Sequence, residues 1–165
     1  MENGEIPDAN IQATSVYGSN RATNGRLNHH WGFWCSVPGQ SGTIWIQADI
    51  GYQTYVSGVI TQGGGQRNPY WVTSFTVSTF MTAGADEVFV ADRNGNAIIF
   101  PGNVEKDAKL TTTFSEPVHA RIVRINCLSK ANHYYALRFE ILGCKIDRYM
   151  TQRDRMRRMP SVNVN

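Results

Sequence analysis

The segment YYALRFEILGC, residues 134–144, decides the fold class, because it reads as a core strand that ends in a cysteine. Apolar side chains occupy one face of this strand at every second position, and charged ones occupy the other: Tyr135, Leu137, Phe139 and Ile141 against Arg138 and Glu140. This period of two is typical of an antiparallel strand with one face in the core. Gly143 and Cys144 close the strand, and a segment of different composition follows. The pattern indicates a disulfide-type extracellular β module, a class that usually works by binding rather than by catalysis.

The composition favours one all-β domain. The 165 residues, 41% of them apolar, suit one core rather than two. Fifteen glycines, 11% aromatic residues and only 18% charged residues fit short strands joined by many turns. A membrane-spanning helix needs a run of about 18 apolar residues, and no run in this sequence approaches that length. The start, MENGEIPDAN, has neither the basic nor the apolar region of a signal peptide, so we expect a piece of a longer secreted precursor or a cytosolic chain.

Positive charge is concentrated at the C-terminal end. Residues 145–165 hold six cationic and two acidic side chains, a net charge of +4, whereas the whole chain carries +3, so residues 1–144 carry −1. The body therefore offers no basic platform for nucleic acid. We expect residues 145–165 to be a basic tail or linker in solvent; a short basic helix that touches anionic lipid or nucleic acid is the alternative.

Strand patterns alternate with turn signals along residues 1–144, and no helical period of 3.6 is sustained there. The predicted strands before the last one are Thr43–Ile50, Tyr55–Thr61, Val72–Phe80, Glu87–Ala91, Ala97–Phe100, Leu110–Phe114 and Ala120–Asn126. Asn94-Gly95 is a hairpin signal, because both residues tolerate a positive φ. The spacing predicts a β-sandwich or jelly roll.

Nine fragments in this order give the chain a family resemblance: MENGEIPDANIQATS, GRLN, FWC, WIQADIG, VSGVITQGG, YWVTSFTVS, FPGN, FSEPVHARIVRI and ALRFEILGC. Together they resemble a discoidin domain, also called the coagulation factor V/VIII type C domain, over residues 1–144. The resemblance implies an eight-stranded antiparallel jelly-roll barrel with its ligand loops at one end. It also implies an extracellular adhesion or recognition role, with glycan, anionic phospholipid or protein ligands.

The cysteines depart from the family pattern. The family has a cysteine shortly before the position of Met1 that bonds the one matching Cys144, so Cys144 lacks its expected partner. A late start of the sequence explains this, and a free thiol or an intermolecular bond is the alternative. Cys127 stands where the family often has proline, and it could pair with Cys35. One of the three cysteines must stay unpaired within the chain.

Three loops carry the candidate ligand contacts: Ser15–Ala22, His29–Gln40 and Gly63–Pro69. In membrane-binding relatives these loops carry pairs of large apolar residues. Each buried side chain contributes about 1.5–3 kcal/mol, so two or three pairs are needed. Here the first loop has only Val16 and Tyr17 and the third has none, while Trp34 of the second is expected in the core. Attachment to phosphatidylserine membranes is therefore the less supported alternative.

A polar ligand fits these loops better. Tyr17 and Trp31 offer flat apolar faces, as sugar recognition requires. Donors and acceptors surround them: Asn20, Arg21, His29, His30, Gln66, Arg67 and Asn68. By resemblance, Tyr17 and Tyr70 match two tyrosines of the peptide pocket in neuropilin-like members. At the positions that match this pocket, Ser41 replaces an acidic residue and Arg21 replaces a tryptophan. These replacements argue against binding of a C-terminal arginine in the manner of the neuropilin-like members.

No catalytic motif is present, so we expect no enzyme: there is no G-x-S-x-G, no H-E-x-x-H and no glycine loop before a helix. We expect no cofactor, although a structural calcium ion held by loop carbonyls, as in some relatives, remains open. Arg121, Arg124 and Arg138 are expected to pair with acidic residues or to cap loop carbonyls. The prediction is a recognition module for glycans or matrix ligands, with no nucleic-acid partner. A purely structural module among other domains of a larger adhesion protein is the third reading.

Overall fold

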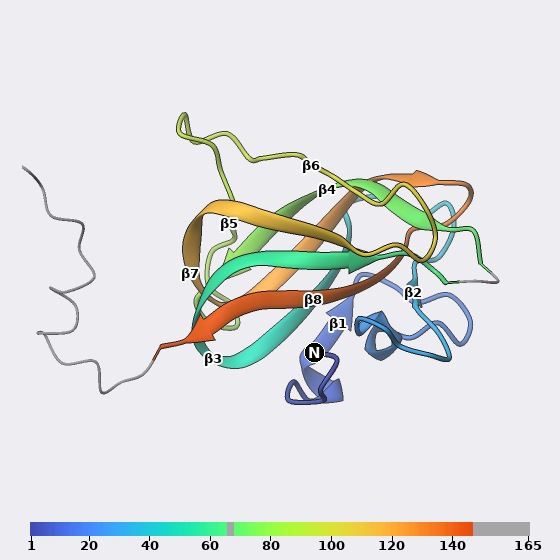
Figure 1. Cartoon of the computed structure of the whole chain (residues 1–165), viewed down its shortest axis with the longest axis horizontal. Coiled ribbons are helices and arrows are strands. Elements are labelled where there is room, and N and C mark those ends of the chain that lie inside the picture. Colours follow the sequence, from blue (N-terminus) through green and yellow to red (C-terminus); the bar gives the residue numbers. More distant parts are fainter. Residues whose placement is uncertain (66–67, 147–165) are drawn as a thin grey trace, which may run out of the picture.

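The structure, a computed structural model, describes residues 1–65 and 68–146. In them, one antiparallel sheet of eight strands accompanies two short 3-10 helices, η1 (Asp8–Asn10) and η2 (Ala22–Gly25). The strands are β1 (Ile11–Ala13), β2 (Trp34–Cys35), β3 (Ile44–Gln62), β4 (Trp71–Phe80), β5 (Val88–Phe89), β6 (Phe100–Pro101), β7 (Leu110–Ala131) and β8 (Ala136–Lys145). The predicted all-β class is confirmed (Figure 1).

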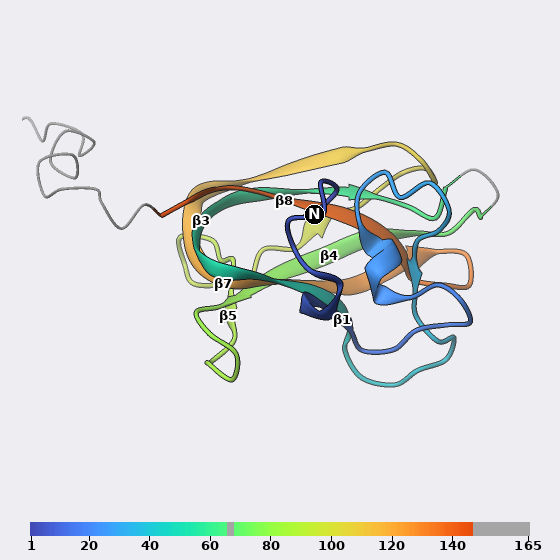
Figure 2. The ribbon, with the colours of Figure 1, turned by 90° about the horizontal axis from the view of Figure 1, so that it is seen from below.

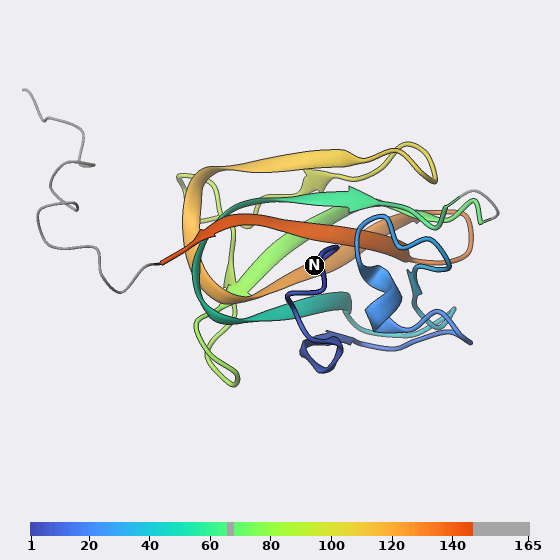
Figure 3. The ribbon, with the colours of Figure 1, turned by 60° about the horizontal axis from the view of Figure 1, so that its bottom comes forward.

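The two long strands, β3 and β7, run through both layers of a sandwich. The first half of β3 pairs with the second half of β7, and after a bend the second half of β3 pairs with the first half of β7. Strands β8 and β2 extend one layer, while β1, β4, β5 and β6 extend the other. Figures 2 and 3 show both long strands bending at the same end of the molecule. The pairing path starts at β2 and ends at β5, so the jelly roll is an open sandwich and not a closed barrel.

A glycine lies in the bend of β3. Gly51 has a φ of 88°, and its N–H donates to the Asp49 carboxylate at 2.8 Å. The sequence predicted two separate strands at 43–50 and 55–61, whereas the structure has one strand that bends at Gly51 and continues. In the same way, the two strands predicted at 110–114 and 120–126 are parts of β7.

The core lies between the layers and draws on both. Trp34, Ile46, Val59, Phe75 and Phe139 are fully buried and belong to one apolar cluster. Burial of each such side chain contributes about 1.5–3 kcal/mol, so this cluster is the main source of stability. The predicted core position of Trp34 is confirmed.

A charged residue of β8 departs from the predicted alternation. Arg138 was expected on the solvent face, yet only 5% of its surface is exposed. Loops, and not the second sheet, cover it: the connections β1–β2, β2–β3, β3–β4, β6–β7 and β7–β8 lie at the end opposite the bends (Figures 1 and 2). The loop end, as we call this end, holds the candidate site.

Candidate functional site

A groove of about 750 Å³ opens at the loop end. Its walls come from segments far apart in the sequence: Glu2, Asn20, Asn28, His29, His30, Trp31, Gly32, Phe33, Gln62, Gly64, Gly65, Asn68, Asp107 and Arg138. Amide, imidazole and backbone groups predominate over apolar surface. Such a lining suits a ligand that forms several directional hydrogen bonds.

Five of the predicted ligand residues line this groove: Asn20, His29, His30, Trp31 and Asn68. Trp31 is the outstanding one, because 95% of its surface is exposed. A large apolar ring in that position loses water only when something covers it, so it is a natural stacking platform. Two of the three glycines after Gln62 have different reasons: a Cβ on Gly63 would lie 2.7 Å from the Lys106 carbonyl oxygen, whereas Gly65 has a φ of 82°.

Three tyrosines form an aromatic cluster next to the groove. The rings of Tyr17 and Tyr134 stack with centroids 5.1 Å apart, and Tyr70 meets Tyr134 edge-on at 4.8 Å. Tyr70 and Tyr134 also pack against a small buried cluster that contains Phe33, a groove residue. A hydrogen bond to Tyr17 raises the pKa of Tyr134, with burial as the second cause. Sequence reasoning placed Tyr134 in the final strand and missed its role; its position at the strand's start, beside the loops, was the available signal.

The other predicted ligand residues do not line the groove. Arg21 precedes η2 and is exposed, and Ser41 is exposed in the β2–β3 connection. Gln66 and Arg67 lie outside the described residues, as do residues 147–165 of the predicted basic tail. The division at residue 144 therefore remains a prediction.

The fold agrees with the comparisons. The model of the F5/8 type C domain matches residues 10–141, most of the chain. The chain belongs to this family. Neuropilin-1 of Mus musculus is 36% identical over 154 residues, which cover 90% of this chain and 16% of that protein. Lactadherin of Rattus norvegicus is 31% identical over 156 residues, covering 87% of this chain and 35% of that protein.

Solved structures share the F5/8 type C fold. Discoidin II of Dictyostelium discoideum matches with a TM-score of 0.73 and 22% identity, over 86% of this chain and 57% of that one. The family 32 carbohydrate-binding module of C. perfringens NanJ, solved with galactose, matches with a TM-score of 0.66 and 15% identity, over 85% of this chain and 95% of that one. Taken together, these relatives support a binding module in general, without pointing to one ligand.

A polar network forms the floor of the groove in this F5/8 type C domain. Arg138 donates Nε to the Gly63 carbonyl oxygen at 2.8 Å and Nη1 to the His29 carbonyl oxygen at 3.4 Å. Its Nη2 forms an ion pair with Asp107 at 2.7 Å. Gln62 also donates to the Asp107 carbonyl oxygen at 2.9 Å and accepts from the N–H of Asn28 at 3.2 Å. The expectation that Arg138 caps loop carbonyls is confirmed.

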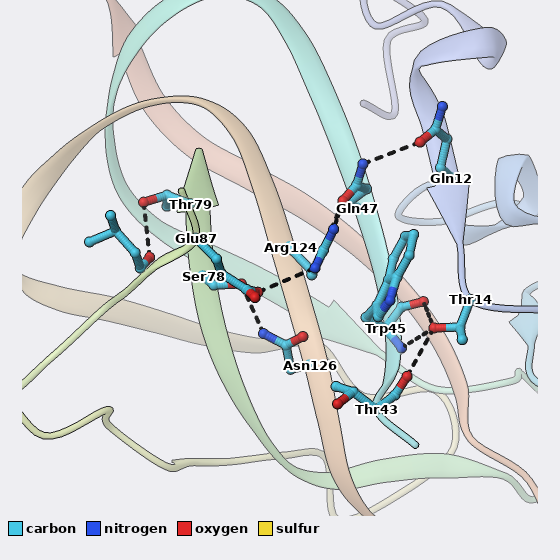
Figure 4. Close-up of polar contacts among 11 residues, drawn as sticks. Gln12, Thr14, Thr43, Trp45, Gln47, Ser78, Thr79, Glu87, Arg124 and Asn126 are labelled. Atoms are coloured by element: carbon cyan, nitrogen blue, oxygen red, sulfur yellow. Dashed lines mark hydrogen bonds and ion pairs between the residues drawn. The ribbon is translucent and has the colours of Figure 1, made fainter. Parts of the chain in front are cut away.

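A second cleft, of about 370 Å³, lies on the outer face of the β1–β3–β7–β4 layer. Arg124 crosses it, donating twice to the Gln47 amide oxygen at 2.7 and 2.9 Å and once to Glu87 at 3.3 Å (Figure 4). Its guanidinium also lies over the rings of Trp45 and Phe80. Gln47 in turn donates to Gln12. The hydrogen-bonding groups of these side chains are partnered with one another, so the network is explained by its structural role of linking neighbouring strands.

The predicted Cys35–Cys127 disulfide is wrong, because both residues are free thiols. They lie in different apolar clusters: Cys35 packs with Phe33 and Ala136, whereas Cys127 belongs to the main core. Burial raises the pKa of the Cys35 thiol to about 11 and that of Cys127 further still. Cys144 is free and exposed.

Among residues 1–65 and 68–146, no three or more His, Cys, Asp or Glu side chains gather to hold a metal ion. His29 and His30, although adjacent, are therefore not joined there by a third side chain of these types. A calcium ion held by loop carbonyls stays an untested prediction. No helix in the described part of the chain is long and apolar enough to cross a membrane.

Proposed function

We propose that this domain is an extracellular recognition module that binds a glycan in the groove at the loop end. The observation that carries the proposal is Trp31, a 95% exposed ring at a groove whose other walls are rich in amides and imidazoles. A pyranose has an apolar C–H face and a rim of hydroxyls, so it needs both a flat ring and directional polar partners.

The charges of the groove support a neutral glycan. Among its described lining residues, the single arginine, Arg138, is outnumbered by two carboxylates, Glu2 and Asp107. Arg138 also spends its donors on two carbonyls and on Asp107. A sulfated or otherwise anionic ligand would therefore find no spare cation among these residues.

Galactose, GalNAc-β-1,3-galactose and chitotriose are suitable probes, because structural neighbours of this chain were solved with them. The test is a titration of the chain with each sugar by calorimetry. We expect saturable binding to at least one, and its loss in Trp31→Ala. Phe89→Ala is the matched control, since Phe89 is an exposed ring on β5 and outside the groove. Full binding by Trp31→Ala would contradict the proposal.

Attachment to anionic membranes is the second candidate, favoured by one observation. Exposed apolar side chains lie at the loop end besides Trp31, including Val16 with 44% and Val104 with 86% of their surface exposed. Pelleting with phosphatidylserine liposomes separates the two functions. Liposome binding without sugar binding would reverse our ranking, and failure of both assays would favour a purely structural module.

The extracellular location is part of this proposal. Residues 1–165 span 16% of neuropilin-1 and 35% of lactadherin, so the activity and partners of a whole protein around this domain are open to test. We propose that it acts beside other domains of a larger chain.

A further inference from the structure

We propose that Arg138 is a positioning residue, which holds the loops around the groove in the arrangement that binds ligand. This inference rests on the proposed function for its ligand, but not for its structural readout. Arg138 itself lies at the floor of the groove, where its guanidinium reaches three loops.

The three acceptors of Arg138 come from three different connections. His29 lies in the β1–β2 connection, Gly63 follows β3, and Asp107 precedes β7. The planar guanidinium can donate in these divergent directions at once, which a single ammonium group cannot do with the same geometry. One side chain thus cross-links both walls of the groove to its floor.

The burial of Arg138 makes this link consequential. Its side chain is 7% exposed and its ion-pair partner Asp107 is 44% exposed. A buried cation is tolerated only where it is paired and hydrogen-bonded, so removing Asp107 leaves Arg138 poorly satisfied. Removing Arg138 takes away the donor that its side chain gives to the Gly63 and His29 carbonyl oxygens. The loop backbones, and with them His29, are then free to leave their positions beside Trp31.

Strand pairing does not explain the contacts of Arg138. A position on β8 needs only its backbone for the pairing with β3, and a smaller apolar side chain would fill a core site without a charge. The cation instead donates to the carbonyl oxygen of Gly63, directly after β3, and to that of His29, three residues beyond the bridge between Arg26 and Phe139 of β8. Its contacts act on the site and not on the sheet.

The experiment compares Arg138→Gln, Arg138→Lys and Asp107→Asn with Arg124→Gln. Arg124 is the matched control, because it is also a β-strand arginine with three side-chain hydrogen bonds, but outside the groove. Asp107→Asn keeps an acceptor oxygen and removes the charge, which covers the case in which Arg138→Gln does not fold. Three quantities are measured for each: the midpoint of thermal unfolding, hydrogen exchange of the loop amides at 27–32, 63–65 and 104–109, and affinity for galactose, GalNAc-β-1,3-galactose and chitotriose.

We expect Arg138→Gln and Asp107→Asn to exchange the loop amides at least about tenfold faster while strand amides at 120–126 keep their protection. Sugar affinity should fall by about tenfold, equivalent to about 1.4 kcal/mol. Arg138→Lys should recover part of both, since it keeps the charge but not the fork. Arg124→Gln should leave the loop exchange and the affinity unchanged.

Three results would overturn the proposal: unchanged exchange of the loops, an equal rise of exchange over loops and strands, or faster loops with undiminished affinity. If the unmodified chain binds none of the three sugars, the proposed function fails by itself. Loop exchange alone then decides whether Arg138 positions the loops.

Discussion

Trp31 and Trp34 lie three residues apart in opposite environments. Trp31 is 95% exposed, whereas Trp34 is fully buried and donates its indole N–H to the Ser15 carbonyl oxygen at 2.8 Å. The chain thus passes from the rim of the groove to the core within one short segment. We therefore expect Trp31 to contribute to binding and Trp34 to contribute to stability.

This separation is testable by denaturation. Trp34→Ala should lower the free energy of unfolding by about 3–5 kcal/mol, because it leaves a large cavity and an unpaired Ser15 carbonyl. Trp31→Ala should change it by less than about 0.5 kcal/mol. Urea titrations followed by circular dichroism give both values. Equal losses in the two variants would show that Trp31 is packed in solution.

The three cysteines differ in the same way. Burial raises the pKa of Cys35 to about 11, so this thiol stays protonated at neutral pH. Near pH 8, iodoacetamide should label Cys144 in the folded chain, and label Cys35 and Cys127 only after unfolding. Peptide mass spectrometry identifies the labelled sites. Unfolded thiols have a pKa of about 8.5, so the two buried thiols should make the fold less stable as pH rises above that value.

At the scale of elements, the sequence predicts what depends on side-chain period and misses what depends on pairing. The alternation in Tyr134–Cys144 predicts β8, and the one in Val72–Phe80 predicts β4. β1 and β2 are too short to show a period, and the two halves of β3 on either side of Gly51 are linked by their pairing with the same strand, β7.

The candidate site also has residues that the sequence predicts and residues that it does not. Residue types in loops, such as Trp31 and His29, indicate the ligand chemistry through their side chains alone. Arg138 has the period of a solvent-facing residue on β8, and only the loops folded above it bury its side chain. Long-range coverage of this kind leaves no local signal in the sequence.

Strand β3 also contains an irregularity that requires glycine. Its pairing with both β7 and β8 shifts register between Val56 and Gly58, and a Cβ on Gly58 would lie 2.2 Å from the Thr112 carbonyl oxygen. Gly58→Ala should therefore lower the free energy of unfolding by about 1–3 kcal/mol. Thr113→Ala, at an exposed site on the paired strand, should change it by less than about 0.5 kcal/mol. Chemical denaturation of both variants checks this, and an unaffected Gly58→Ala would mean that the strands separate to admit a methyl group.

At the scale of the whole molecule, the bends of β3 and β7 and the loop end lie at opposite ends of the sandwich (Figure 2). The core fixes the strands, and the strands fix where the loops begin and end. The charge has its own distribution, since residues 145–165 carry +4 and residues 1–144 carry −1. A glycan held at the loop end and an anionic membrane attracted by the basic segment would therefore respond differently to salt.

Salt dependence thus tests the assignment of function to the groove. Sugar affinity should change by less than about twofold between about 0.05 M and about 0.5 M NaCl, because the described groove residues carry no surplus cation. Any liposome binding should fall steeply over this range and weaken in the double variant Arg157→Gln/Arg158→Gln, since each basic residue near an anionic surface contributes about 1 kcal/mol. Calorimetry and liposome pelleting at each salt concentration provide the measurements. A sugar affinity that falls with salt, or that weakens in the double variant, would place cations in the binding site and contradict a neutral glycan as the ligand.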